Sequence, residues 1–434
     1  MTQSRTKQLA LSTLILAGLG TVTAPLWAQQ TNNGPRGIQL RLGVAVGLET
    51  QSNRALDVTN PGRTSEAVID LSLGVLSETR TQRLSFDVGG ELRNASGPSL
   101  TQSGFVNPYG QLNYDRSSAS ARLSLSASLR ETDLNDNDFD LDFGEITTSS
   151  ESQAFTFVDG DATRRNTNLF ARLDWRDDAP LGFGVQARLE ENTFSGGTAT
   201  GVGGTPLNDT RRLTLGVSAR VDINEATRLD SSLTFSQFEE DTVAGSRDTW
   251  TFGNRLTLDR PRGGLTFSFN VTDTEDGTRY ATNVGRSLEY PLGIISGRIG
   301  FTRGVTGETF LSGGLNLTRA LPRGNMTVDL SRSVNSGALE DTEQLNTTLR
   351  LGYLHELSPL ASLSIGADWA EVSQTSTGVD TTSASITATY RRELTSDWGM
   401  NLGIRHRFRD DGVTGSARSN EVFMNLSRDF LTRF

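Results

Sequence analysis

Hydrophobic and polar residues alternate strictly along residues 38–50, which read IQLRLGVAVGLET. The even positions from Ile38 to Leu48 are all apolar, and the odd positions from Gln39 to Glu49 are polar, charged or small. Only a β-strand places alternate residues on opposite faces. The polar face carries full charges that a packed core would not accept, and about 9–11 residues let a tilted strand cross a bilayer. The segment therefore predicts a strand with one face in lipid and the other in water.

The same alternation recurs to the end of the chain and predicts about twenty strands, within a range of 18–20. Every second connection is a tight turn, and the connections between them are predicted as loops of about ten to over thirty residues. The clearest tight turns are Thr79–Gln82, Arg260–Gly263, Tyr290–Gly293 and Leu321–Gly324. Short periplasmic turns and long extracellular loops are typical of outer-membrane barrels. Residues 38–434 are therefore predicted to form an all-β transmembrane, antiparallel up-and-down β-barrel.

Aromatic residues of the apolar phase gather at the ends of the predicted strands, as expected for two interfacial girdles. Those beside the short turns are Tyr114, Trp175, Phe183, Tyr290, Tyr353, Tyr390 and Trp398. Those beside the long loops are Phe235, Trp250, Tyr280, Phe301, Trp369 and Phe408.

The first 28 residues have the pattern of a secretory signal peptide. Arg5 and Lys7 supply the positive start, Leu9–Leu19 the apolar segment, and Ala28 a cleavage site. The apolar segment is too short to span a membrane as a helix. Residues 29–37 form a short polar tail, so we expect no plug ahead of the barrel.

The last strand, from Ser419 to Phe430 near a terminal Phe434, adds a further feature. With the signal peptide and the even strand number, it resembles the outer-membrane β-barrel proteins of Gram-negative bacteria, and among them the porins. The resemblance is architectural and carries no subfamily signature. It implies an outer-membrane location, contact with outer-membrane lipid and lipopolysaccharide, and recognition of a C-terminal aromatic residue by the barrel assembly machinery. Phe430 has the phase for that signal, which leaves Leu431–Phe434 as an extra tail.

Two soluble folds with many strands, the β-sandwich and the β-solenoid, fit the pattern less well. A sandwich would bury the face that here carries Arg, Asp and Glu, and a solenoid has shorter strands at a regular period. The barrel is therefore the favoured fold.

Composition narrows the chemistry. The chain has no cysteine, so it has no disulfide and no thiol nucleophile. The formal net charge is −10, and removal of Arg5 and Lys7 with the signal peptide makes it about −12. An acidic balance argues against nucleic acid as a partner, because nucleic acid requires a basic surface.

The predicted interior is wide and charged. Twenty strands about 4.8 Å apart and tilted by about 40° give a diameter of roughly 40 Å, which side chains cannot fill. The charged residues of the inward phase form either a hydrated wall of weak ion pairs or a filter for ions and small polar solutes. The predicted pore-lining residues are Arg41, Asp70, Arg83, Asp87, Glu91, Arg122, Arg130, Arg172, Asp174, Arg188, Glu190 and Arg212.

The third long loop, predicted at 131–165, is the longest insertion and is strongly acidic. Its predicted constriction residues are Asp133, Asp136, Asp138, Asp140, Asp142 and Glu145. Its position resembles that of the constriction loop of general porins, which implies that it narrows the pore; an exposed surface loop is the alternative. The acids do not form an EF-hand, because Asp138 replaces the turn glycine and Gly144 the bidentate glutamate. Loose calcium bridging stays an open alternative, and no metal site or cofactor is predicted.

An enzyme would need a base, and the chain has two histidines, His355 and His406. Both have the phase of the lipid face, so no catalytic residue is predicted. The sequence favours a porin-like channel for passive diffusion of ions and small hydrophilic solutes. Polysaccharide export and a structural or enzymatic barrel without an open pore are the alternatives. Oligomeric state is not fixed by the pattern.

Overall fold

The computed structural model describes most of the predicted barrel. The described residues are 37–54, 56, 58–59, 62–98, 103–133, 158–176, 178–199, 208–241, 245–336, 343–374, 380–410, 412 and 415–434, with backbone only at 158–162, 197–199, 335–336 and 374. The predicted signal peptide, 1–28, and the tail up to residue 36 lie outside them. Among the described residues, no helix is long and apolar enough to cross a bilayer.

Twenty antiparallel strands form one sheet that closes on itself, because the first strand pairs with the last from Gln39↔Arg433 to Gln51↔Glu421. The strands are β1 Gly37–Gln51, β2 Thr64–Glu78, β3 Gln82–Ser96, β4 Gly104–Ser117, β5 Ala121–Asp133, β6 Val158–Trp175, β7 Leu181–Ala199, β8 Thr210–Asn224, β9 Thr227–Glu240, β10 Ser246–Arg260, β11 Gly263–Thr274, β12 Gly277–Tyr290, β13 Gly293–Arg303, β14 Thr309–Leu321, β15 Gly324–Ser336, β16 Glu343–Ser358, β17 Ala361–Gln374, β18 Asp380–Glu393, β19 Trp398–Asp410 and β20 Ser416–Arg433. The predicted all-β barrel is confirmed.

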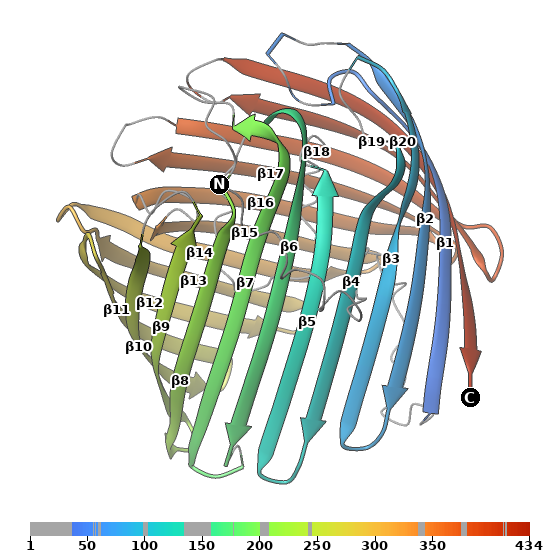
Figure 1. Ribbon diagram of the computed structural model, residues 1–434. Coiled ribbons are helices and arrows are strands. Elements are labelled where there is room, and N and C mark those ends of the chain that lie inside the picture. The colour runs from blue at the N-terminus through green and yellow to red at the C-terminus, as the bar shows by residue number, and fades with distance from the viewer. Residues whose placement is uncertain are drawn as a thin grey trace, which may run out of the picture.

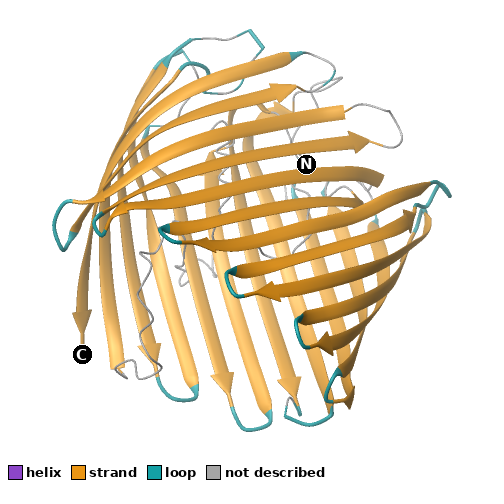
Figure 2. Cartoon of the chain, turned by 180° about the vertical axis from the view of Figure 1, so that it is seen from behind, coloured by secondary structure: helices purple, strands orange, loops and turns teal. Residues whose placement is uncertain are grey.

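Each strand pairs with its neighbours in chain order, so the topology is up-and-down, and Figures 1 and 2 show the wall from two opposite sides. The tight turns lie at one rim, where β1 also begins and β20 ends. Gly263 and Gly324 open strands there at φ +112° and +146°, and a Cβ on either would collide with a carbonyl oxygen of the adjacent strand. Glycine is therefore required at both turns.

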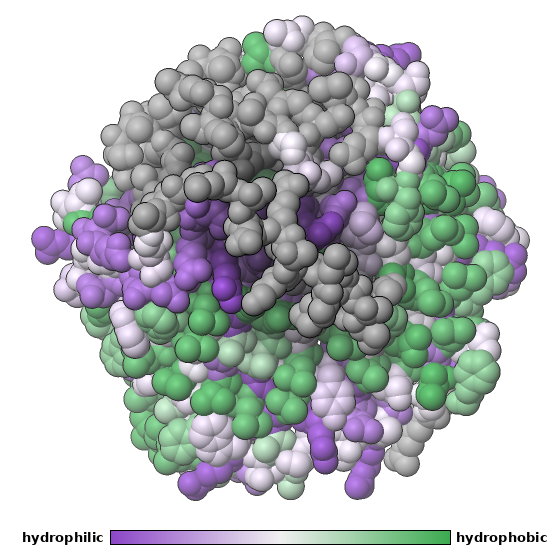
Figure 3. Space-filling model, in the orientation of Figure 1, coloured by the Kyte–Doolittle hydropathy of each residue, from purple (hydrophilic) through white to green (hydrophobic). Residues whose placement is uncertain are grey.

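The two faces of the wall have opposite polarity. Leu42, Leu71, Phe252 and Ile404 are examples of large apolar side chains that stay exposed on the outer face. In Figure 3 such residues gather in a hydrophobic band across the lower part of the molecule, above a hydrophilic lower rim. Among the described residues the buried hydrophobic set is confined to Leu56, Val106, Val334 and Ala417. The outer face therefore suits lipid, and the described strands and turns build no conventional apolar core.

The connections at the opposite rim differ from the prediction. β11 and β12 are joined by residues 275–276 alone, and β13 and β14 by residues 304–308. The expectation of loops of ten or more residues is therefore wrong for these two connections, whereas the β1–β2 connection, 52–63, and the β7–β8 connection, 200–209, have the expected length. Tyr280 accordingly lies beside a two-residue turn, where Asp276 is followed by Gly277 at φ +137°, a pair typical of tight hairpins.

The predicted third loop is too long at both ends. Residues 131–133 belong to β5 and 158–165 to β6, and Glu131 pairs with Arg165 at 2.8 Å across the two strands. The reason is that outward positions beyond the bilayer need not be apolar, so the alternation that marks a strand disappears there. Residues 134–157 lie outside the described residues.

The expected tail after Phe430 is also strand. Leu431 pairs with Arg41 and Arg433 with Gln39, and the Phe434 amide donates to the Ile38 carbonyl oxygen at 2.9 Å. Backbone pairing with β1 therefore continues to the end of the chain.

Leu71→Arg tests the assignment of the faces, because Leu71 is an outward residue at the midpoint of β2. We expect a loss of about 2–4 kcal/mol in unfolding free energy, the cost of arginine at the bilayer midplane. Urea titration of the barrel in lipid vesicles measures it. Ser72→Arg, one residue on and facing inward, is the control; an equal loss there would contradict the assignment.

Candidate functional site

The inner wall carries the predicted pore-lining residues. The strands place all twelve in the phase opposite to the exposed apolar residues, and several pair along or across strands. Arg41 Nε lies 3.1 Å from Asp429, and Arg172 binds Asp174 at 2.8 Å. The full set is Arg41, Asp70, Arg83, Asp87, Glu91, Arg122, Arg130, Arg172, Asp174, Arg188, Glu190 and Arg212. Their role in lining a conducting pore stays a prediction.

Inward-facing aromatic rings add to this wall. The Arg212 and Arg247 guanidinium groups lie 5.2 and 4.8 Å from the centroid of the Phe238 ring. Arg188 lies 5.6 Å from the Phe170 ring. Stacking of this kind fixes the position of an arginine without neutralising its charge. These arginines therefore add positive charge to the inner wall.

The start of the first long connection, residues 52–54, lies against the inner wall across the seam where β20 meets β1. The Ser52 amide donates to the Asn420 carbonyl oxygen at 2.9 Å, and the Asn53 amide donates to Ser419 Oγ at 3.3 Å. Arg407 of β19 donates to the Arg54 carbonyl oxygen at 3.3 Å. Asn53 and Arg54 are buried as a result, at 1% and 3% exposure.

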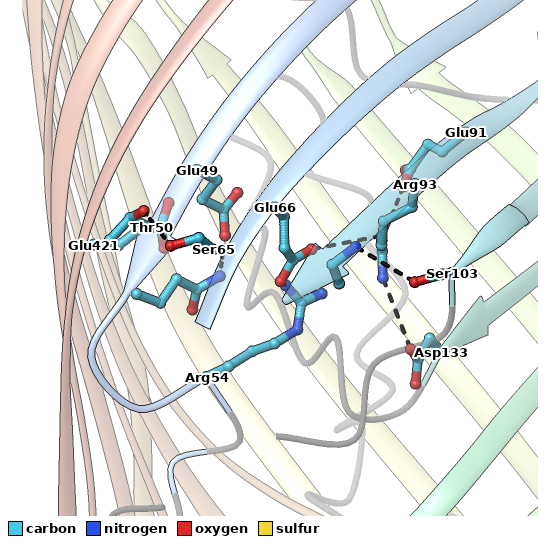
Figure 4. A network of polar contacts seen from close by, with 12 residues as sticks. Glu49, Thr50, Arg54, Ser65, Glu66, Glu91, Arg93, Ser103, Asp133 and Glu421 are labelled. Carbon is cyan, nitrogen blue, oxygen red and sulfur yellow. Dashed lines mark hydrogen bonds and ion pairs between the residues drawn. The ribbon is translucent and has the colours of Figure 1, made fainter. Parts of the chain in front are cut away.

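A buried ion-pair network continues from this connection along the wall (Figure 4). Arg54 pairs with Glu66 of β2, and Glu66 lies 3.6 Å from Arg93 Nε of β3. Arg93 also binds Glu91 at 2.8 Å and lies 3.7 Å from Asp133 Oδ2. We call these five residues the rim network. It joins the first long connection, β2, β3 and the end of β5.

Backbone irregularities bring the rim network together. The β3–β4 pairing shifts register between Gly89 and Glu91, and Asn107 of β4 has φ +50°, a left-handed conformation that asparagine tolerates. Asn107 Nδ2 donates to Glu91 at 3.1 Å, and the Asp133 amide donates to Asn107 Oδ1 at 3.1 Å. Asn107 therefore ties β4 to both acids.

Two members of the rim network, Glu91 and Asp133, were among the residues predicted from the sequence, and the other three were not. Glu66 and Arg93 continue the inward phase of β2 and β3, so a longer estimate of each strand would have included them. Arg54 lies in a polar connection with no periodicity, and its contact had no signal in the sequence.

Of the six predicted constriction residues, the structure describes Asp133. Asp133 is the last residue of β5, buried at 2% exposure in the rim network, so its assignment to the acidic loop is wrong. Asp133 belongs to a strand because β5 continues beyond the residues in which apolar and polar positions alternate. The remaining members, Asp136, Asp138, Asp140, Asp142 and Glu145, lie outside the described residues.

The two histidines lie on the outer face, as their phase predicted. His355 stacks on Tyr353 with ring centroids 6.1 Å apart, and His406 Nδ1 lies 2.8 Å from Asn420 Oδ1. Within the described part of the chain, no cluster of three or more His, Asp or Glu residues could hold a metal ion.

Solved structures share this architecture. The siderophore receptor PirA from Pseudomonas aeruginosa superimposes with a TM-score of 0.50 at 8% identity, over 90% of this chain and 80% of PirA. The chain has the fold of an outer-membrane β-barrel. The ferric enterobactin receptor PfeA and OpdO, both from Pseudomonas aeruginosa, give TM-scores of 0.49 and 0.41 at 10% and 13% identity, over 91% of this chain and 81% and 97% of theirs. No protein-family profile and no curated protein matches the barrel's sequence.

Arg93→Met tests the rim network. The variant leaves Glu66, Glu91 and Asp133 without the cation they share, and we expect it to lower the unfolding free energy by about 3–5 kcal/mol, the cost of breaking a buried ion pair. Arg41→Met is the matched control, because the Arg41–Asp429 pair is about half exposed and should cost at most about 1 kcal/mol. If urea titrations gave the same loss of unfolding free energy for both variants, the rim network would stabilise the barrel no more than an exposed ion pair does.

Proposed function

We propose that the protein is an outer-membrane channel through which ions and small hydrophilic solutes diffuse passively. One observation carries the proposal: a closed twenty-stranded wall with an apolar outer face has arginines and carboxylates along its inner face. A charged inner wall is expensive to bury in a solid core and is suited to water.

The inner wall explains how such a channel would work. Arg41 and Asp429, and Arg172 and Asp174, are partly exposed pairs whose charges water screens only in part. Ions of both signs can therefore exchange along the wall without a deep binding site, which is what rapid passage requires.

The location and partners follow from the same proposal. The apolar face would contact outer-membrane lipid, with lipopolysaccharide beside the rim opposite the tight turns. The barrel assembly machinery would insert the chain after a signal peptide directs its export.

Planar-bilayer recording tests the channel. The chain from Gln29 onward is refolded in detergent, and its folding is verified by circular dichroism and by heat-dependent mobility in electrophoresis. We expect steady, ohmic current steps in potassium chloride. A folded barrel that gives no current would overturn the proposal in favour of a closed exporter, a structural barrel or an enzyme.

The acidic loop supplies a second test, of ion selectivity. We propose that its acids face the pore, by analogy with the constriction loops that its position resembles. Changing Asp136, Asp138, Asp140 and Asp142 to Asn and Glu145 to Gln should then shift the reversal potential in a salt gradient away from cation preference. Glu275→Gln with Asp276→Asn, in the short β11–β12 turn, is the control. Unchanged selectivity in the loop variant would contradict an inward position.

A further inference from the structure

The inner wall holds a recess of about 440 Å³ on β6–β11, in the half of the barrel nearer the tight turns. At one level of this wall the inward residues of four successive strands are small or polar: Ser218, Ser232, Gly253 and Asn270. A Cβ on Gly253 would lie 2.8 Å from Asn270 Oδ1 and 3.1 Å from Ser232 Oγ. Glycine therefore lets these two side chains converge and leaves space above them.

A row of charges borders this floor. Arg220 of β8 and Arg255 of β10 both pair in register with Asp230 of β9, so the row alternates positive, negative and positive. Arg172 and Asp174 of β6 line the side of the recess. Three arginines and two aspartates thus line the recess, and Asp222 lies beside Arg220 just outside the lining.

The three arginines differ in how they are engaged. Arg172 binds Asp174 through two nitrogens at 2.8 Å, and Arg220 donates to the Ala179 carbonyl oxygen at 2.9 Å and lies 3.5 Å from Asp222. Arg255 is exposed and makes no hydrogen bond or ion pair with any residue in the described part of the chain. Its guanidinium group therefore has its full set of donors available above a polar floor.

This arrangement matches one kind of solute. A guanidinium group binds a carboxylate through two parallel hydrogen bonds, while serine hydroxyls, an asparagine amide and Asp230 can bond hydroxyl groups. Arg172 and Arg220 each have an acidic neighbour, so the single arginine Arg255 suits one carboxylate better than a doubly charged phosphate ester. The volume lies within the range of about 300–1,000 Å³ of small-molecule sites.

We propose that the recess binds a small hydroxylated carboxylate, with the carboxylate on Arg255 and hydroxyl groups on Asp230, Ser232 and Asn270. The inference rests on the proposed function, since it names the class of solute that the channel retains during passage. Sodium gluconate is the probe, and glucose is its uncharged analogue.

Binding is measured twice, by calorimetry on the refolded barrel in detergent and by interruption of the single-channel current in a bilayer. We expect gluconate to bind and to interrupt the current, and glucose to bind far more weakly. R255Q should weaken gluconate binding about 10- to 100-fold, as expected for loss of a charge-assisted hydrogen bond. R298Q removes an inward, exposed arginine of β13 outside the recess and should leave binding unchanged.

R255K separates geometry from charge, because lysine keeps the positive charge but loses the planar fork, and an intermediate affinity is expected. R255K also tests the role of Arg255 if R255Q does not fold. Absence of gluconate binding, equal binding of glucose, or equal effects of R255Q and R298Q would each overturn the site. A barrel that gives no current but binds gluconate through Arg255 would overturn the proposed channel and leave the site standing.

Discussion

The structure depends on one constraint: in lipid, every backbone N–H and C=O must find a partner within the protein. An open sheet of these twenty strands would have nineteen strand pairings and two edges without partners, and pairing of β1 with β20 removes both edges. The strands are then fixed in register all around the wall. The alternation along each strand decides which side chains contact lipid and which contact water. Closure satisfies the backbone, and the sequence alternation sets the polarity of the two faces.

As a consequence, the buried residues of this protein have an unusual composition. The residues that are most buried are polar or charged. Gln51, Asn53 and Ser419 lie where the first long connection meets the wall, and Asp133 lies at the end of β5. Buried charges are tolerated when they are paired, and the rim network pairs two arginines with three acids. It gives specific packing on the inner face of a barrel whose apolar residues are committed to lipid.

The sequence was sufficient to predict the strands, their phase and the tight turns, because period-two alternation is strong wherever one face is lipid. It failed where that contrast disappears. Glu131 and Arg165 continue β5 and β6 beyond the apolar band, and Arg54 makes its contacts from a connection without periodicity. Arg255 could be placed on the inner face from its phase, but the recess beside it depends on curvature and on Gly253, which alternation does not encode.

The bond from the Asn53 amide to Ser419 has a consequence for the order of folding. Its two residues are 366 positions apart, and Ser419 belongs to the last strand. Contacts between such distant residues carry a large loop-closure cost until intervening structure brings them together. The first connection can therefore take up this position only when the last strand lies beside the first, so its burial accompanies closure of the barrel.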